Sequence, residues 1–169
     1  ESWNITHPDD IRMLARGYFD AGCNIVNANT FGANRLKFDN PEDIIRTGVR
    51  LCREARHEAG RDDDAYVAVD IGPTGKLLEP MGDLPFNEAV NIFKEMISAG
   101  VNEGCDLVLI ETMSDSYEAK AAVLAAKECC SLPVIVTLVF DETGRLLTGG
   151  TVRSSVAMLE GLHIDAIGI

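Results

Sequence analysis

The chain has 169 residues, of which 46% are hydrophobic, 25% charged and 6% aromatic. This composition is typical of a globular domain with one hydrophobic core and excludes a disordered or collagen-like chain. The 27 acidic residues outnumber the 15 Lys and Arg residues and leave a formal charge of -12. Because such a charge repels phosphate backbones and anionic lipid surfaces, nucleic acid and membrane partners are not expected.

The cysteine pattern and the hydropathy pattern bear on the cellular compartment. Cys23, Cys52, Cys105, Cys129 and Cys130 are odd in number and form no CxxC pair. This pattern favours free thiols over a disulfide framework or a self-contained zinc knuckle. No apolar run reaches the roughly 18 to 20 residues of a membrane span, and the first residues lack the pattern of a secretory signal. We therefore expect a cytoplasmic protein.

In chain order, the first predicted element is a helix. Apolar residues recur at helical spacing from Pro8, which suits a first helical turn, to Phe19. Residues 25–31 then predict a short buried strand that is β-branched at its start and polar at its end. A second helix is predicted from the start signal at 40–43 to Gly60, which ends it.

The same alternation continues to residue 169. Asp115 and Glu118 predict a capping box at the start of one helix, with Asp in the capping role. Further strands are predicted over residues 66–71, 107–112, 134–140 and 166–169, and further helices over 86–103, 115–128 and 152–159.

Five strands with helices between them and no hairpin dipeptide predict an α/β fold with a parallel sheet. Two architectures fit, a TIM barrel and a doubly wound open sheet. Polar groups close the successive strands at Asn29, Asp70, Glu111 and, slightly inside, Thr137. In a barrel all these ends converge on one mouth, whereas an open sheet gathers only those at its switch point. We therefore expect an incomplete (β/α)8 barrel, since eight units need about 250 residues.

Glu111 and Asp70 are the main candidates for chemistry. Each is either a solvated strand end or a carboxylate that fixes an ammonium group or acts as a base when burial raises its pKa. Asp70 could instead cap the turn at 72–75. Asn29 could instead hydrogen bond to backbone groups of the loop. Three polar strand ends that point the same way favour a site. An unrelated βα enzyme that uses Asp70 and Glu111 as an acid and base pair stays open.

Other motifs carry less information. The turn at 72–75 lacks the Gly-Lys-Ser/Thr ending of a phosphate loop. The three histidines are scattered, without the HExxH spacing of a metal site. Cys129 and Cys130 end a helix, so in a barrel they belong to the N-terminal end of the sheet, opposite the active site.

Five short motifs, taken in order, resemble the homocysteine S-methyltransferase family. Within that family the resemblance is closest to the homocysteine-binding module of the cobalamin-dependent methionine synthases, and it covers essentially the whole chain. Each motif is weak alone, but the order and spacing together are specific. The motifs are Asn29–Asn34, Asp70–Gly75, Glu111–Asp115, Phe140–Glu142 with Thr148–Gly149, and Ile164–Ile169.

The resemblance implies a TIM barrel of which this chain supplies about strands two to six. It implies an enzyme that binds homocysteine as a thiolate on a zinc ion held by three cysteines and methylates it to methionine. A metal ion lowers the pKa of a bound thiol, so the nucleophile exists at neutral pH. For Glu111 the resemblance implies an anchor for the substrate amino group, and for Asn29, Asp70, Thr112 and Thr137 it implies places in the pocket wall.

The chain departs from the family pattern in its metal ligands. The zinc cysteines of the family follow the sixth and eighth strands, and no cysteine of this chain matches them. We therefore expect residues 1–169 to be a partial homocysteine-binding barrel domain, truncated at both ends, inactive alone and without bound zinc or cobalamin. Its expected partners are homocysteine, the remainder of the barrel, and folate and cobalamin modules.

Two further alternatives for the function of the chain stay open beside the unrelated βα enzyme. One is a non-catalytic barrel fragment that acts as a binding or assembly module. The other is a homocysteine methyltransferase that uses betaine or S-methylmethionine as methyl donor.

Overall fold

The computed structural model describes all residues, 1–169, as six helices and five strands. The helices are α1 (Trp3–Thr6), α2 (Pro8–Asp20), α3 (Pro41–Glu58), α4 (Phe86–Asn102), α5 (Ser116–Cys129) and α6 (Val152–Gly161). The strands are β1 (Ile25–Asn27), β2 (Tyr66–Ile71), β3 (Leu107–Met113), β4 (Val134–Leu138) and β5 (Ala166–Gly168).

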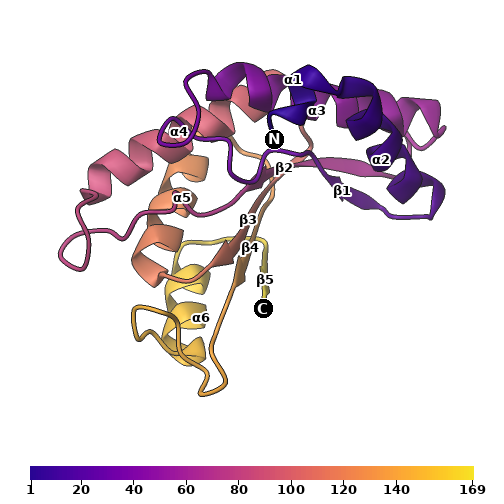
Figure 1. The fold of residues 1–169 in the computed structure, drawn as a ribbon. Coiled ribbons are helices and arrows are strands. Elements are labelled where there is room, and N and C mark those ends of the chain that lie inside the picture. Colours follow the sequence, from indigo (N-terminus) through magenta and orange to yellow (C-terminus); the bar gives the residue numbers. More distant parts are fainter.

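The five strands form one parallel sheet in the order β1-β2-β3-β4-β5. Because each strand lies beside the next strand of the chain, the crossovers all run in one direction and place their helices on one face. Figure 1 shows the helices on the convex side of the curved sheet. A doubly wound sheet would reverse direction at a switch point and carry helices on both faces. The fold is therefore part of a TIM barrel, as predicted.

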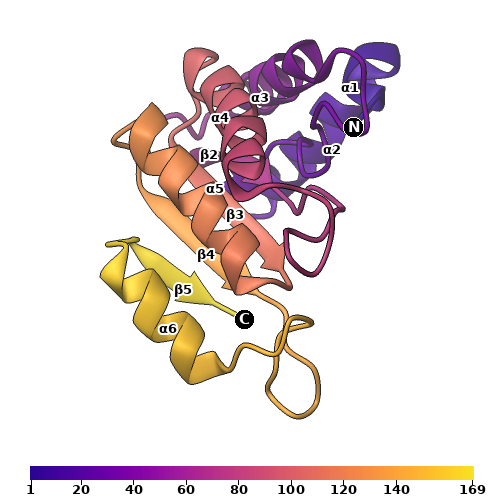
Figure 2. The same ribbon diagram turned by 90° about the vertical axis from the view of Figure 1, so that its left-hand side faces the viewer.

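The convex face of the sheet forms the hydrophobic core with the helices. Val69, Val108, Ile110 and Val136 have no exposed surface, and each fully buried side chain of this kind contributes about 1.5–3 kcal/mol. In Figure 2, α4, α5 and α6 stand in front of the strands that they cover. Gly100 allows α4 to approach β2 closely, since a Cβ there would lie 2.5 Å from Val69. This packing holds the strands in place.

The concave face of the sheet is not covered by a helix (Figure 1). Ile25 on β1 and Tyr66 on β2 are about half exposed there, at 45% and 52%. The outermost strands, β1 and β5, each have one neighbour in the sheet. No helix is both long enough and apolar enough to cross a membrane.

Some element boundaries differ from the sequence prediction. The single turn α1 was not predicted, because four residues are too few to show a helical period. The strand β1 ends at Asn27 instead of residue 31, because the following segment turns across the end of β2 and Thr30 bonds to Asp70. The strand β4 ends at Leu138 instead of residue 140.

The predicted capping box of α5 forms only in part. The carboxylate of Asp115 accepts a hydrogen bond from Tyr117 N (2.9 Å), as a capping residue does. Glu118 does not reach back to Asp115, because its carboxylate accepts bonds from the backbone N (2.8 Å) and the hydroxyl (2.6 Å) of Thr74. A tertiary contact therefore replaces the local one and ties the loop after β2 to α5.

Candidate functional site

Asp70 and Glu111 lie on neighbouring strands at the C-terminal edge of the sheet. Asp70 on β2 is in register with Leu109 on β3, and Glu111 follows two residues later. Because side chains alternate between the two faces of a strand, both carboxyl groups share the concave face. Glu111 is within hydrogen-bonding reach of the Asp70 carboxyl group. The structure therefore brings the two main candidates together.

The backbone of Asp70 is held by the segment that follows β1. The hydroxyl of Thr30, which is fully buried, donates to Asp70 O (2.8 Å) and accepts from Asp70 N (3.0 Å). Next to it, the ring of Phe31 packs on Gly72, where a Cβ would lie 2.6 Å from the ring. This close approach requires glycine at position 72. The end of β2 is thus fixed on one side by the loop after β1.

The side chain of Asp70 is buried, and one of its two carboxyl oxygens has no hydrogen-bond donor. The residue is only 7% exposed, and its Oδ1 atom has no partner. Burial, the neighbouring charge of Glu111 and the more distant charge of Glu1 raise the pKa of Asp70 to about 8. The side chain of Asn27, on the same face of β1, opposes this rise by hydrogen bonding. Asp70 is therefore protonated over much of the neutral range.

Glu111 is followed by an irregularity in β3. The register between β3 and β4 shifts between Ile110 and Met113, and Thr112 adopts φ 62°, in the left-handed region. A β-branched residue rarely adopts this conformation, which costs about 1–3 kcal/mol. Thr112 N donates to the hydroxyl of Thr137 on β4 (3.1 Å), which joins two more of the predicted residues. Backbone strain of this kind is concentrated at functional sites.

The side chain of Asn29 bonds to α1 and makes no hydrogen bond to the carboxyl pair. Its side chain donates to the side-chain oxygen of Asn4 on α1 (2.8 Å), and Asn4 in turn donates to the backbone oxygen of Asn29 (2.8 Å). The structure therefore places Asn29 against α1, in a role that fits the alternative of satisfying loop groups. Its place in the pocket wall remains a prediction.

The loops at this edge of the sheet are joined at the start of α5. Glu118 is 3% exposed and binds Thr74 of the loop after β2, as described above. The carboxylate of Asp115 also accepts a bond from the hydroxyl of Thr148 (3.0 Å), in the loop after β4. Three successive loops are thus held together around the C-terminal ends of β2, β3 and β4.

Sequence reasoning missed two residues of the site. Asn27 faces Asp70, and Thr30 holds the Asp70 backbone. The alternation of β1 places Asn27 on the face opposite to the buried Val26, but only the pairing of Asn27 with Ala68 in the folded sheet puts it on the face of Asp70. Thr30 carries no comparable signal, because its bond to Asp70 is made by a loop.

The residues of this chain do not fit a zinc ion. No three His, Cys, Asp or Glu residues lie close enough together to hold a metal. Cys52 and Cys105 are buried, and burial raises the pKa of each thiol to about 12. Cys129 ends α5, where its sulfur contacts the hydroxyl of Ser98 (3.3 Å). A thiolate ligand set is therefore absent among residues 1–169.

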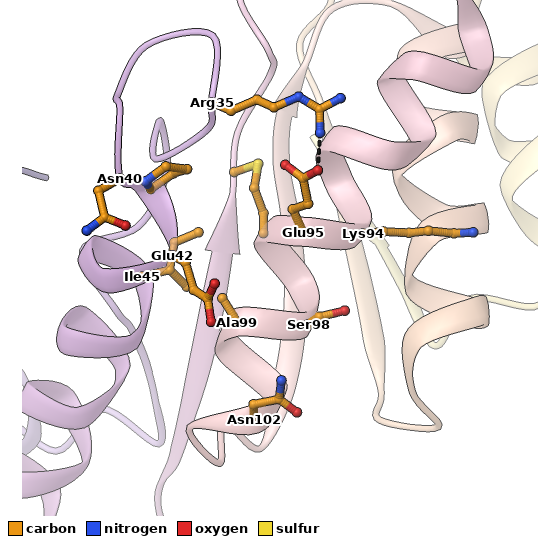
Figure 3. A pocket seen from close by; sticks show the side chains of 11 residues that line it. Arg35, Asn40, Glu42, Ile45, Lys94, Glu95, Ser98, Ala99 and Asn102 are labelled. Atoms are coloured by element: carbon orange, nitrogen blue, oxygen red, sulfur yellow. Dashed lines mark hydrogen bonds and ion pairs between the residues drawn. The ribbon is translucent and has the colours of Figure 1, made fainter.

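A surface hollow between α3 and α4 lies outside this cluster (Figure 3). Arg35 at its upper rim forms ion pairs with Glu88 and Glu95, which neutralise its charge. None of the predicted site residues lines the hollow. It belongs to the helical side of the fold, whereas the carboxyl cluster lies on the concave side of the sheet.

Comparison with known proteins shows the family of this chain. A family model described as Homocysteine S-methyltransferase matches residues 1–169. The methionine synthases of Mycobacterium leprae and Mycobacterium tuberculosis are 30% and 29% identical to this chain over 181 residues, which cover all of it. The chain spans only 15% of the length of each of these relatives.

A solved structure shares the fold. The metallated homocysteine methyltransferase MmuM from Escherichia coli superimposes with a TM-score of 0.87, at 20% sequence identity. The match covers 99% of this chain and 65% of that one.

Proposed function

We propose, since this chain belongs to the homocysteine S-methyltransferase family, that it binds homocysteine in an enzyme that methylates the homocysteine sulfur and releases methionine. The observation that carries the proposal is the pair of carboxyl groups, Asp70 and Glu111, at the C-terminal edge of a partial barrel. Active sites of TIM barrels lie at this edge. An α-amino acid carries an ammonium group, and a carboxylate without a cation is its natural partner.

The proposed roles of the residues follow from their placement. Glu111 is half-buried on the open concave face and binds the substrate ammonium group. Asp70 lies beside it, and Thr112 and Thr137 form the adjoining wall. Asn29 is proposed for the wall on the side of β1, where its amide group is held by Asn4. None of these residues is assigned as an acid, base or nucleophile of the methyl transfer itself.

We further propose that residues 1–169 are one part of the homocysteine-binding barrel. Two features support this: the relatives are far longer than the chain, and both β1 and β5 have a free edge. Zinc and cobalamin would be held by other parts of such a protein, because no three His, Cys, Asp or Glu residues of this chain lie close enough together to hold a metal ion. The segment alone should therefore be inactive.

The methyl donor that we propose is methylcobalamin, with folate and cobalamin modules as partners of the barrel. The support is the similarity to proteins named methionine synthase, at about 30% identity over the whole chain. A cytoplasmic location is proposed with it and can be tested by cell fractionation.

Methyl transfer by the full-length protein that contains this chain tests the proposal. The protein is supplied with L-homocysteine and, in separate reactions, methylcobalamin, betaine or S-methylmethionine, and methionine is measured. Methionine should form with methylcobalamin only, and the isolated 169-residue segment should form none. Formation with betaine or S-methylmethionine would replace the proposed donor. A protein that neither forms methionine nor binds homocysteine would refute the proposed function.

A further inference from the structure

No positively charged group is among those that act on the Asp70 carboxyl group at the end of β2. Lys37, in the loop after β1, acts on Glu118 instead, and its Nζ lies over Gly32 on the side of Glu1. The charged groups that act on Asp70 are Glu111 from β3 and Glu1 from the first residue of the chain, and both are acidic. The remaining polar neighbour is the neutral amide of Asn27 on β1. Glu1 itself is engaged, since its carboxylate accepts a hydrogen bond from Gly32 N (2.6 Å). The site therefore holds a concentrated negative charge.

The unpaired Oδ1 atom of Asp70 makes this arrangement costly when both groups are ionised. A buried carboxylate oxygen without a donor loses its hydration, and a second carboxylate within hydrogen-bonding reach adds repulsion. A single proton removes both penalties, because the Asp70 O–H then donates to Glu111 and the pair carries a charge of −1. A bound cation removes them equally well, because it pairs with both ionised groups.

We propose that Asp70 and Glu111 share one proton in the empty site, and that the ammonium group of the amino-acid substrate displaces this proton when it binds. This inference rests on the proposed function and adds a proton exchange to it. The O–H bond of Asp70 breaks, and the proton leaves to solvent. The charge of the pair changes from −1 to −2, and the ammonium group supplies the compensating +1. The net charge of the site is unchanged.

The exchange makes substrate binding depend on pH. Below the pKa of Asp70, at about 8, the ligand must expel a proton, so its affinity rises about tenfold for each pH unit. A site with an ionised Glu111 alone would show no such slope between pH 6 and 7.5. The same exchange lets the site reject neutral molecules of similar shape, because they cannot compensate the second negative charge.

Proton release by the full-length protein tests the exchange. L-methionine is used as the probe because it has the same amino-acid group but no thiol proton. Calorimetric titrations at pH 6.5 in two buffers of different ionisation enthalpy count the protons released per methionine bound. We expect about one proton for the unmodified protein, none for Asp70→Asn, and about one for the control Asp63→Asn. Asp63 is exposed and precedes β2 at the opposite edge of the sheet.

The outcomes separate the two proposals. Methionine or homocysteine that binds the unmodified protein without releasing a proton overturns the exchange and leaves the proposed function intact. Absence of binding by both amino acids overturns both. If Asp70→Asn does not fold, the buffer dependence of the unmodified protein still decides, together with the expected tenfold rise in methionine affinity between pH 6.5 and 7.5.

Discussion

The two edges of the sheet use acidic residues in opposite ways. At the N-terminal edge, Asp106 precedes β3, and its carboxylate accepts bonds from Val67 N (2.7 Å) and from the guanidinium of Arg56 (2.7 Å). Asp165 precedes β5 and accepts from Val134 N (2.8 Å) in the same way. At the C-terminal edge, Asp70 has an oxygen without any partner.

The comparison separates acidic groups that stabilise the sheet from acidic groups that are left free to bind a proton or a cation. Asp106 and Asp165 also donate their own backbone N–H groups, to Val67 O and Val134 O of the neighbouring strands. Each of these aspartates therefore joins two strands at their start. These groups are satisfied without a ligand and stabilise the sheet. The carboxyl pair at the other edge is satisfied only by a proton or a cation, which is the condition of a site that binds one. In TIM barrels the same division places function at the C-terminal edge.

The largest expected effect is on ligand binding when the charge of the C-terminal edge is removed. Glu111→Gln keeps the size of the side chain but removes the anion that we propose as the partner of the substrate ammonium group. We expect affinity for L-homocysteine to fall on the order of 100-fold, because loss of one partner of a desolvated charge pair costs about 2–5 kcal/mol. Calorimetry measures the affinity, and thermal unfolding serves as the control. Unchanged affinity would remove Glu111 from the site.

The corresponding change at the N-terminal edge should affect stability instead. Asp106→Ala leaves the backbone N–H of Val67 without its side-chain acceptor and removes the shortest ion pair of Arg56, which keeps its longer bonds to Asp62 and to Ala65 O (both 3.3 Å). We expect the free energy of unfolding to fall by about 2 kcal/mol, with little change in homocysteine affinity. Urea denaturation measures the loss. The exposed control Asp63→Ala should stay within about 0.5 kcal/mol. An equal loss of unfolding free energy in Asp106→Ala and Asp63→Ala would contradict the division between the edges.

The pH dependence of stability distinguishes the edges further. Because the pKa of Asp70 is raised from 3.8 to about 8 in the fold, the folded state binds more protons than the unfolded state between these values. The contribution of Asp70 to stability is therefore present at low pH and is lost as pH rises towards 8, by at most about 1.4 kcal/mol per pH unit. Asp70→Asn should remove this slope. Urea midpoints at pH 6 and 7 test it, and an unaltered slope in the variant would contradict the assignment.

The smallest expected effect concerns the strained residue of β3. Thr112→Gly removes the penalty of a β-branched residue at φ 62° but adds chain entropy to the unfolded state. We expect a gain in the free energy of unfolding of less than about 1 kcal/mol. Homocysteine affinity should decrease because Glu111 becomes less rigidly placed. A variant that loses stability would show that Thr112 is not strained.

Much of the fold was predictable from local patterns. Hydrophobic periodicity identified the helices α2 to α6, and the start of every strand agrees with the structure. Polar residues at successive strand ends favoured the barrel, and the sequential strand order confirms it. These features are local or repeat along the chain, so a single sequence contains them.

Features that depend on tertiary contacts were not predictable. Glu118 has the spacing of a capping-box residue, but its carboxylate binds Thr74, 44 positions away. Asn29 stands at a strand end, yet its side chain bonds to Asn4 on α1. The pairing of Asp70 with Glu111 required the register between β2 and β3, which only the folded sheet supplies.

A crystal structure of the full-length protein with bound L-homocysteine is the most direct test of the carboxyl pair as the substrate site. Our account predicts the amino nitrogen of the ligand within hydrogen-bonding distance of both the Glu111 and the Asp70 carboxylates. A homocysteine molecule bound elsewhere, with this pair still joined by its own hydrogen bond, would contradict it.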